Sequence, residues 1–328
     1  MSVGFNVDVL LALAAGGIVL AGILAPFEAL GWWAGWFGPN RDQQQGTPKH
    51  LQPSNRYIVF LSGIHSVSGS TFVRRERMFL RQLKKRFPES TVLEVFPYSV
   101  TNRALTGQRA FAWFWRWALG WKLSRRSLLA IAGFVINFRN GWQVAVSTDK
   151  RYGPMYDEGS AELIERTLLD AGWRDDHDGT VVLVGYSGGS QIALGAASPL
   201  ARRLGVPCSV VSLGGVMASP RSLDGLDRLW HVKGSGDKVT RIGTLFFPGR
   251  WPLVRWSAWN RGVRDGIVRI VASGNHDHTG RNGYLDATTR QPDGRSNLEA
   301  TLDTLERVLA DDSVRQTAAA RQHAGSRA

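Results

Sequence analysis

The stretch VVLVGYSGGSQIALGAA, residues 181–197, decides the fold. A β-branched run ends at Gly185-Tyr186-Ser187-Gly188-Gly189, and a helical pattern follows at once. The pattern G-x-S-x-G between a strand and a helix is typical of a tight turn that raises a serine hydroxyl above a parallel sheet. A phosphate-binding loop would need G-x-x-x-x-G-K-[ST], which the chain lacks. The stretch therefore predicts Ser187 as a nucleophile, with Gly185 and Gly189 as the glycines of the turn.

Strands and helices alternate on both sides of this turn. Short apolar runs predict strands at 57–61, 91–96, 181–184, 208–213, 229–232 and 267–272. Helical spacing predicts helices at 74–87, 157–172 and 188–197, and a capping box at 296–299 opens a final one. This rhythm predicts an α/β fold, in which helices cover both faces of a mostly parallel sheet. Functional side chains are then expected at the carboxyl ends of the strands.

A nucleophilic serine needs a base and an acid that orients the base, and the chain supplies both further along. Asp237 ends a Gly-Ser-Gly-Asp loop after the fifth strand, where it also suits a helix cap. Two histidines follow the sixth strand. His276 lies nearer the strand end, whereas His278 opens the loop HTGRNGYL, whose glycines permit a wide turn. The residues alone leave the base open between these two histidines.

A metal site built from His276, Asp277 and His278 would need a further ligand cluster elsewhere, and none matches. The single cysteine, Cys208, excludes an internal disulfide framework and a cysteine-based zinc cluster. We therefore expect neither a metal nor another cofactor.

The anionic intermediate of acyl transfer is stabilised by two backbone N–H donors. One donor is expected at Gly188, the residue after the nucleophile. The other is expected at Ile64 in the loop after the first strand, where Gly63 allows close approach.

From residue 57 to 309 the chain resembles the α/β-hydrolase superfamily, on GYSGG, GSGD and the histidine loop. It is similar to a largely uncharacterised bacterial group of membrane-anchored α/β-hydrolase-like proteins. The group shares segments like FPGRWPL (247–253), Trp259-Asn260, and H-x-G-x-x-G-Y-L followed by PDGRS (292–296). The resemblance implies His278 rather than His276 as the base. It also implies ester, thioester or amide hydrolysis, or acyl transfer, without a cofactor, and it leaves the substrate open.

The amino terminus predicts a membrane anchor. Residues 9–27 carry no charge, and about 20 apolar residues suffice to cross a bilayer. The tryptophans at 32, 33 and 36 are typical of an interface belt. A cleaved signal peptide needs a basic start, whereas residues 1–8 contain no Lys or Arg. We therefore assign residues 1–38 to a single-pass anchor with its interfacial segment.

The rest of the domain plan follows from polarity. Residues 39–56 predict a linker, 57–310 the hydrolase domain, and 311–328 a polar, frayed tail. Arg41 and Lys49 follow the anchor, so the positive-inside rule places the catalytic domain in the cytoplasm.

The chain carries 40 Lys and Arg against 27 Asp and Glu, a net charge of +13. An insertion at about 99–150 has the most distinctive composition in the chain. It contains RAFAWFWRWALGWK at 109–122, followed by an apolar run at 127–138 that is too short to span a bilayer. Basic and aromatic residues in this pattern predict a helical cap that lies on anionic lipid or covers the active site. Nucleic acid is a weaker expectation, because the neighbouring anchor makes lipid the simpler partner.

Together these features predict a membrane-anchored serine hydrolase that cleaves an acyl ester, lipid-like in character. Two alternatives stay open: an acyltransferase or thioesterase with the same triad, and a membrane scaffold without catalysis.

Overall fold

The computed structural model describes residues 53–65, 74–98, 129–174 and 179–325, with isolated residues between 15 and 35. Side chains are described within these ranges except at 129–136 and 312–325. The predicted anchor at 9–27, the linker up to residue 52 and the basic-aromatic segment 109–122 lie largely or wholly outside the described residues. Among the described residues, no helix combines the length and the apolar character that a membrane crossing needs.

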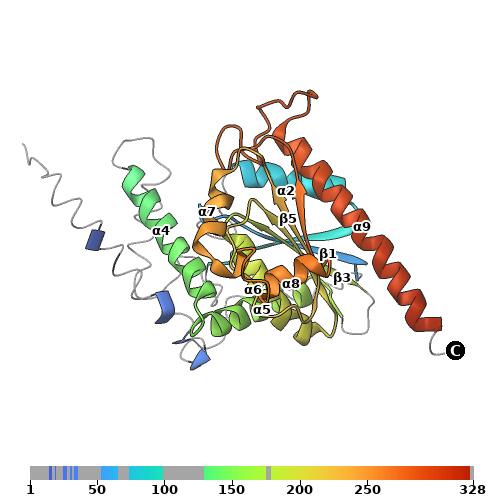
Figure 1. The fold of residues 1–328 in the computed structure, drawn as a ribbon. Coiled ribbons are helices and arrows are strands. Elements are labelled where there is room, and N and C mark those ends of the chain that lie inside the picture. The colour runs from blue at the N-terminus through green and yellow to red at the C-terminus, as the bar shows by residue number, and fades with distance from the viewer. Residues whose placement is uncertain are drawn as a thin grey trace, which may run out of the picture.

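Six parallel strands form one sheet in the order β2-β1-β3-β4-β5-β6 (Figure 1). The strands are β1 (Arg56–Leu61), β2 (Ser90–Val95), β3 (Thr180–Tyr186), β4 (Cys208–Leu213), β5 (Leu226–Lys233) and β6 (Val268–Ala272). Each overlaps one of the predicted strands. The parallel α/β architecture is therefore confirmed, and the carboxyl ends of β3, β5 and β6 lie at the same edge of the sheet.

Two hydrophobic cores lie on the two faces of the sheet. In β1, Tyr57, Val59 and Leu61 pack into one core, while Ile58 and Phe60 pack into the other. This is the alternation expected of a strand that is covered on both faces. The first core includes residues of α5 (Gly153–Asp170) and α6 (Gly189–Leu204), and the second includes residues of α2 (Arg74–Arg86) and α9 (Asn297–Gly325).

The start of α9 confirms the predicted capping box. Ser296 N donates to Glu299 Oε2 at 2.6 Å, and Glu299 N donates to Ser296 Oγ at 3.2 Å. The helix then continues to Gly325, beyond the point where we predicted a frayed tail. The physical reason is that residues 311–324 contain no Gly or Pro and include an alanine run, so nothing in the sequence stops the helix.

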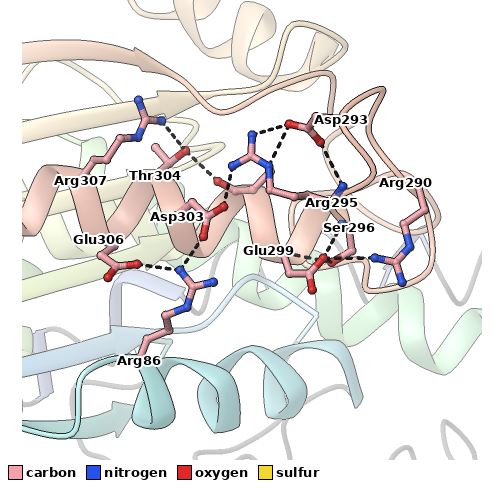
Figure 2. A network of polar contacts seen from close by, with 11 residues as sticks. Arg86, Arg290, Asp293, Arg295, Ser296, Glu299, Asp303, Thr304, Glu306 and Arg307 are labelled. Carbon is pink, nitrogen blue, oxygen red and sulfur yellow. Dashed lines mark hydrogen bonds and ion pairs between the residues drawn. The ribbon is translucent and has the colours of Figure 1, made fainter.

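A polar network ties α9 to α2 (Figure 2). Arg86, at the end of α2, lies 2.5 Å from Asp303 and 2.7 Å from Glu306. Arg295 pairs with Asp293 at 2.5 Å and with Asp303 at 2.6 Å. These pairs are partly or largely exposed, so each contributes about 1 kcal/mol or less.

Helix α4 (Leu129–Thr148) is longer than the apolar run at 127–138 predicted. Its second half, 139–148, carries polar residues that are buried against the rest of the fold, such as Asn140, Gln143 and Ser147. Polar residues in this pattern predict a helix face exposed to solvent. The structure buries them instead, because segments that are distant in the chain pack against them. The insertion therefore ends in a helix that is docked on α5 and α6.

A buried ion pair fixes the end of α4. Asp157 of α5 is buried, and its carboxylate accepts from Arg221 and from Ser147 Oγ, the latter at 2.9 Å. Arg221 also donates to the carbonyls of Ser147 (2.6 Å) and Asp149 (2.9 Å), where α4 ends. Burial, the largest influence, raises the pKa of Asp157 to about 7.

Arg221→Met removes the only cation that pairs with Asp157 among the described residues. A buried charge without its partner costs about 3–5 kcal/mol, so we expect a loss of unfolding free energy of that size in urea unfolding near pH 8. The loss should shrink near pH 5, because Asp157 is protonated in the folded state below its pKa of about 7. Arg290→Met, which breaks an exposed pair with Glu299, is the control and should cost about 1 kcal/mol or less. Equal losses in both variants would contradict a structural role for the buried pair.

Candidate active site

Ser187 lies at the turn between β3 and α6 in a left-handed backbone conformation. Its φ is 53°, a conformation that L side chains rarely adopt. A Cβ at Gly185 would lie 2.4 Å from Ser190 Cα, and a Cβ at Gly189 would lie 2.5 Å from Leu61 O. Glycine is therefore required at both positions, because the turn is packed against the helix it starts and the strand beside it. This is the local geometry that raises a serine hydroxyl above the sheet.

The structure brings Ser187, His278 and Asp237 together. Ser187 Oγ lies 2.8 Å from His278 Nε2. On the other side of the ring, His278 Nδ1 lies 3.0 Å from Asp237 Oδ2 and 3.2 Å from Oδ1. The three residues follow the carboxyl ends of β3, β6 and β5, respectively. A serine, an imidazole and a carboxylate in this chain of contacts can activate the serine for attack on an acyl group.

Asp237 is both a helix cap and the partner of the histidine. It begins α7 (Lys238–Phe246), where its Oδ1 accepts from Val239 N at 2.9 Å and from Thr240 N at 3.2 Å. Its Oδ2 lies 3.0 Å from His278 Nδ1 and also accepts a hydrogen bond from Tyr284. The helix cap is therefore confirmed, whereas the role of Asp237 as the acid of a triad stays a prediction. The cap fixes the carboxylate against rotation.

Tyr284 is a site residue that sequence reasoning missed. Its hydroxyl donates to Asp237 Oδ2 at 2.9 Å and accepts from Gly234 N at 2.6 Å. Burial acts to raise the pKa of Asp237, but hydrogen bonds from His278, Tyr284 and Thr240 outweigh it, so this pKa lies below its ordinary value. The signal was present in the sequence as the tyrosine of HTGRNGYL, yet nothing local indicated that it reaches the acid.

The loop that carries His278 is held by polar contacts. Tyr186, next to Ser187, donates its hydroxyl to His278 O at 2.9 Å. Asp286 is buried further along, and its pKa lies well below the ordinary value because hydrogen-bond donors of the loop outweigh the effect of burial. Its carboxylate accepts from Asn282 N (2.9 Å), Thr288 N (3.1 Å), Thr288 Oγ1 (2.8 Å) and Thr289 Oγ1 (2.6 Å). The position of the imidazole is therefore set by the folded loop.

His276, the alternative base, has other surroundings. It is fully buried, its ring packs against Tyr284 at 5.2 Å, and its Nδ1 lies 3.1 Å from Gln291 Nε2. Burial lowers its pKa. The structure therefore brings His278, and not His276, to the serine. Asp277 contacts Asn282 instead, and no group of three or more possible metal ligands occurs among the described residues.

Ile64 and Gly188, the predicted oxyanion donors, lie side by side. A Cβ on Gly188 would lie 2.8 Å from Ile64 Cγ2 and 2.9 Å from Val144 Cγ2. Neither residue's amide donates a hydrogen bond within the part of the chain that the structure describes. Two adjacent amides next to the serine, for which the described residues provide no acceptor, suit a developing negative charge. Their catalytic role stays a prediction.

Three side chains from separate elements hold the loop of Ile64. They come from α2, from the end of β2 and from α4, so the insertion itself contributes to the site. The bonds run from Gly63 N to Glu76 Oε1 (3.0 Å), from Tyr98 Oη to Ser62 O (2.8 Å) and from Asn140 Nδ2 to Ile64 O (2.8 Å). Sequence reasoning found none of the three, because each is far from the loop along the chain.

The chain matches no protein-family profile and no curated protein. Solved structures to which the chain is similar include esterase PE8 (19% identity, TM-score 0.38), covering 80% of this chain and 96% of that one. A dienelactone hydrolase-like promiscuous phosphotriesterase from metagenomic libraries has 11% identity and a TM-score of 0.39, with 79% and 85% covered. The dienelactone hydrolase of Anabaena variabilis has 14% identity and a TM-score of 0.36, with 78% and 86% covered. These structures are of an esterase and of dienelactone hydrolase-like enzymes.

Tyr284→Phe removes a hydrogen bond to the ionised Asp237. Because the pKa of Asp237 is lowered in the folded state, its contribution to stability is present above the unfolded pKa of about 3.9 and is lost as the pH falls through the folded pKa. We expect the variant to lose about 1–3 kcal/mol of unfolding free energy at neutral pH, and less near pH 3. Urea unfolding at both pH values measures the difference.

Tyr98→Phe is the matched control, because this buried hydroxyl donates to the Ser62 carbonyl and not to a carboxylate. Its loss should be the same at both pH values. The same pH dependence in both variants would contradict the stabilisation of ionised Asp237 by Tyr284.

Proposed function

We propose that the chain is a membrane-anchored serine hydrolase with an α/β-hydrolase fold, which cleaves an acyl ester of lipid-like character. One observation carries the proposal: the contacts from Ser187 Oγ to His278 Nε2 and from His278 Nδ1 to Asp237. The order Ser, Asp, His along the chain is also the one used by α/β-hydrolases.

In the proposed first step, Ser187 Oγ attacks the acyl carbonyl carbon and passes its proton to His278 Nε2. Charge moves to the carbonyl oxygen, which accepts from the amides of Ile64 and Gly188. Asp237 keeps the imidazole in the tautomer with the proton on Nδ1 and stabilises the imidazolium. The bond to the leaving oxygen then breaks, and that oxygen takes the proton from His278.

In the second step, water gives a proton to His278 and its oxygen attacks the acyl carbon on Ser187. The bond from Ser187 Oγ to that carbon then breaks, Oγ takes the proton back from His278, and the acid is released. If another nucleophile replaces water, the same residues perform acyl transfer. Product analysis with and without an added alcohol or thiol acceptor separates the two reactions.

The proposed membrane anchor rests on residues 9–27, and the lipid-like substrate on the basic and aromatic segment 109–122. An enzyme held at a bilayer meets esters that are partitioned there at high local concentration. The domain is proposed to face the cytoplasm, on the basic residues that follow the anchor.

Fluorophosphonate labelling tests the activated serine. We expect the wild type to be labelled and Ser187→Ala not, since the reagent reacts with an activated serine oxygen. His278→Ala should slow labelling by about 10⁴-fold, because the proton acceptor is lost. His276→Ala, provided that circular dichroism shows it folded, should still be labelled. Absence of labelling in folded wild-type protein would sink the hydrolase proposal.

A substrate comparison tests the lipid-like character. We expect faster turnover of a long-chain ester presented in vesicles than of a short, monomeric ester, in kcat/KM terms. The full-length protein with Ser187→Ala as the blank is the system to measure. Equal turnover of both esters would remove the bilayer from the proposal while leaving the triad intact.

A further inference from the structure

The segment 238–264 exposes an unusual amount of apolar surface. It comprises α7, the 3₁₀ turn η3 (Pro248–Arg250) and α8 (Ala258–Arg264), together with the loops between them. Leu253 is 83% exposed, Trp256 74% and Phe246 71%. We name the α7–α8 surface by its exposed apolar residues: Ile242, Leu245, Phe246, Trp251, Leu253, Trp256 and Val263. Single exposed apolar residues are ordinary, but a run of seven in one short segment indicates an interaction surface.

This surface is held in place by a folded frame. Trp251 Nε1 donates to Thr244 O at 2.9 Å, which joins α7 to the loop that follows η3. Asn260 Nδ2 donates to the carbonyls of Trp251 and Val254, each at 2.8 Å, which joins α8 to the same loop. The apolar side chains therefore point outward from an ordered backbone.

The charges of the segment have one sign. Residues 238–264 contain no Asp or Glu. The exposed cations are Lys238, Arg241, Arg255, Arg261 and Arg264. No ion pair joins any of them to a carboxylate in the described part of the chain. Unpaired cations around aromatic and aliphatic side chains are complementary to lipid phosphates above an acyl layer.

Charge disfavours two other partners for the α7–α8 surface, namely segment 99–128 of this chain and a second copy of the protein. The segment 99–128 of this chain contains basic residues and no acidic ones, so it offers nothing to pair with these cations. A second copy that used the same surface would oppose cation to cation. An anionic bilayer suits both the cations and the apolar side chains of this surface. Its headgroups pair with the guanidinium groups, while the aromatic rings and Leu253 enter the interface.

The surface adjoins the catalytic residues. Asp237 caps the first turn of α7, so α7 starts from the residue that contacts His278. We propose that the α7–α8 surface seats the protein on an anionic lipid bilayer and so brings bilayer-borne acyl esters to Ser187. The substrate part of this inference rests on the proposed function, whereas the seating itself is measurable without turnover.

A single environment-sensitive label tests the seating in the full-length protein. The only native cysteine, Cys208, is buried, and burial raises the pKa of its thiol to about 12, so Leu253→Cys is labelled selectively. Leu169→Cys is the matched control, because Leu169 is 49% exposed on α5, outside this surface. With nitrobenzoxadiazole at each site and Ser187→Ala to prevent turnover, vesicles of phosphatidylglycerol and phosphatidylcholine are added.

We expect a blue shift and a gain of emission at position 253 and little change at 169. The response should weaken with phosphatidylcholine alone and at high salt. No response at 253 with vesicle-bound protein would overturn the proposal. Equal responses at positions 253 and 169 would also overturn the proposal, because they would indicate non-specific adsorption. Blue-shifted emission at 253 before vesicles are added would assign the surface to another segment or a second copy.

Turnover separates this inference from the proposed function. The double variant Leu253→Ser, Trp256→Ser alters two exposed residues outside the triad. We expect its kcat/KM for a soluble ester to match the wild type, and its apparent KM for vesicle-borne ester to rise about tenfold or more, from lost apolar burial. An unchanged vesicle KM with intact soluble activity would overturn the seating and leave the hydrolase proposal standing.

Discussion

The turn at Ser187 is the constraint on which the rest of the site depends. Its φ of 53° is an unfavourable conformation for a serine, of the kind that costs about 1–3 kcal/mol. The turn tolerates this because Gly185 and Gly189 let the strand, the helix and the neighbouring strand β1 approach within van der Waals contact. The same packing sets Gly188 beside Ile64, so Ser187 and the two predicted oxyanion donors are positioned by one arrangement of backbone.

The groups that surround the serine serve two purposes each. Asp237 satisfies the first amides of α7 and also faces His278, and Tyr284 binds both Asp237 and the backbone at Gly234. These shared contacts have a physical reason, because a buried carboxylate is tolerated only when its oxygens receive hydrogen bonds. The insertion takes part as well, since Asn140 of α4 holds the loop of Ile64. Its described helix is therefore a component of the site and not only a cover.

The sequence predicted what depends on local patterns. The six strands, the turn at Ser187, the cap at 296–299 and the location of Asp237 all follow from short runs of residues. Contacts between segments that are distant in the chain could not be predicted from the sequence. Glu76, Asn140 and Tyr284 are examples, because they reach the site only after the sheet has brought distant segments together. The residues alone left the base open between His276 and His278, and the resemblance favoured His278, which is the histidine that the structure places beside Ser187. The predicted helix at 127–138 was too short, because the polar residues in the second half of α4 are buried in the structure but look like exposed residues in the sequence.

The central claim is that Ser187 is an activated nucleophile next to a preformed oxyanion site. A crystal structure of the protein after reaction with a fluorophosphonate tests it most directly. The account predicts a covalent bond from Ser187 Oγ to phosphorus, with the phosphonyl oxygen about 2.7–3.1 Å from the amides of both Ile64 and Gly188. An adduct on another residue, or a phosphonyl oxygen turned away from these two amides, would contradict it.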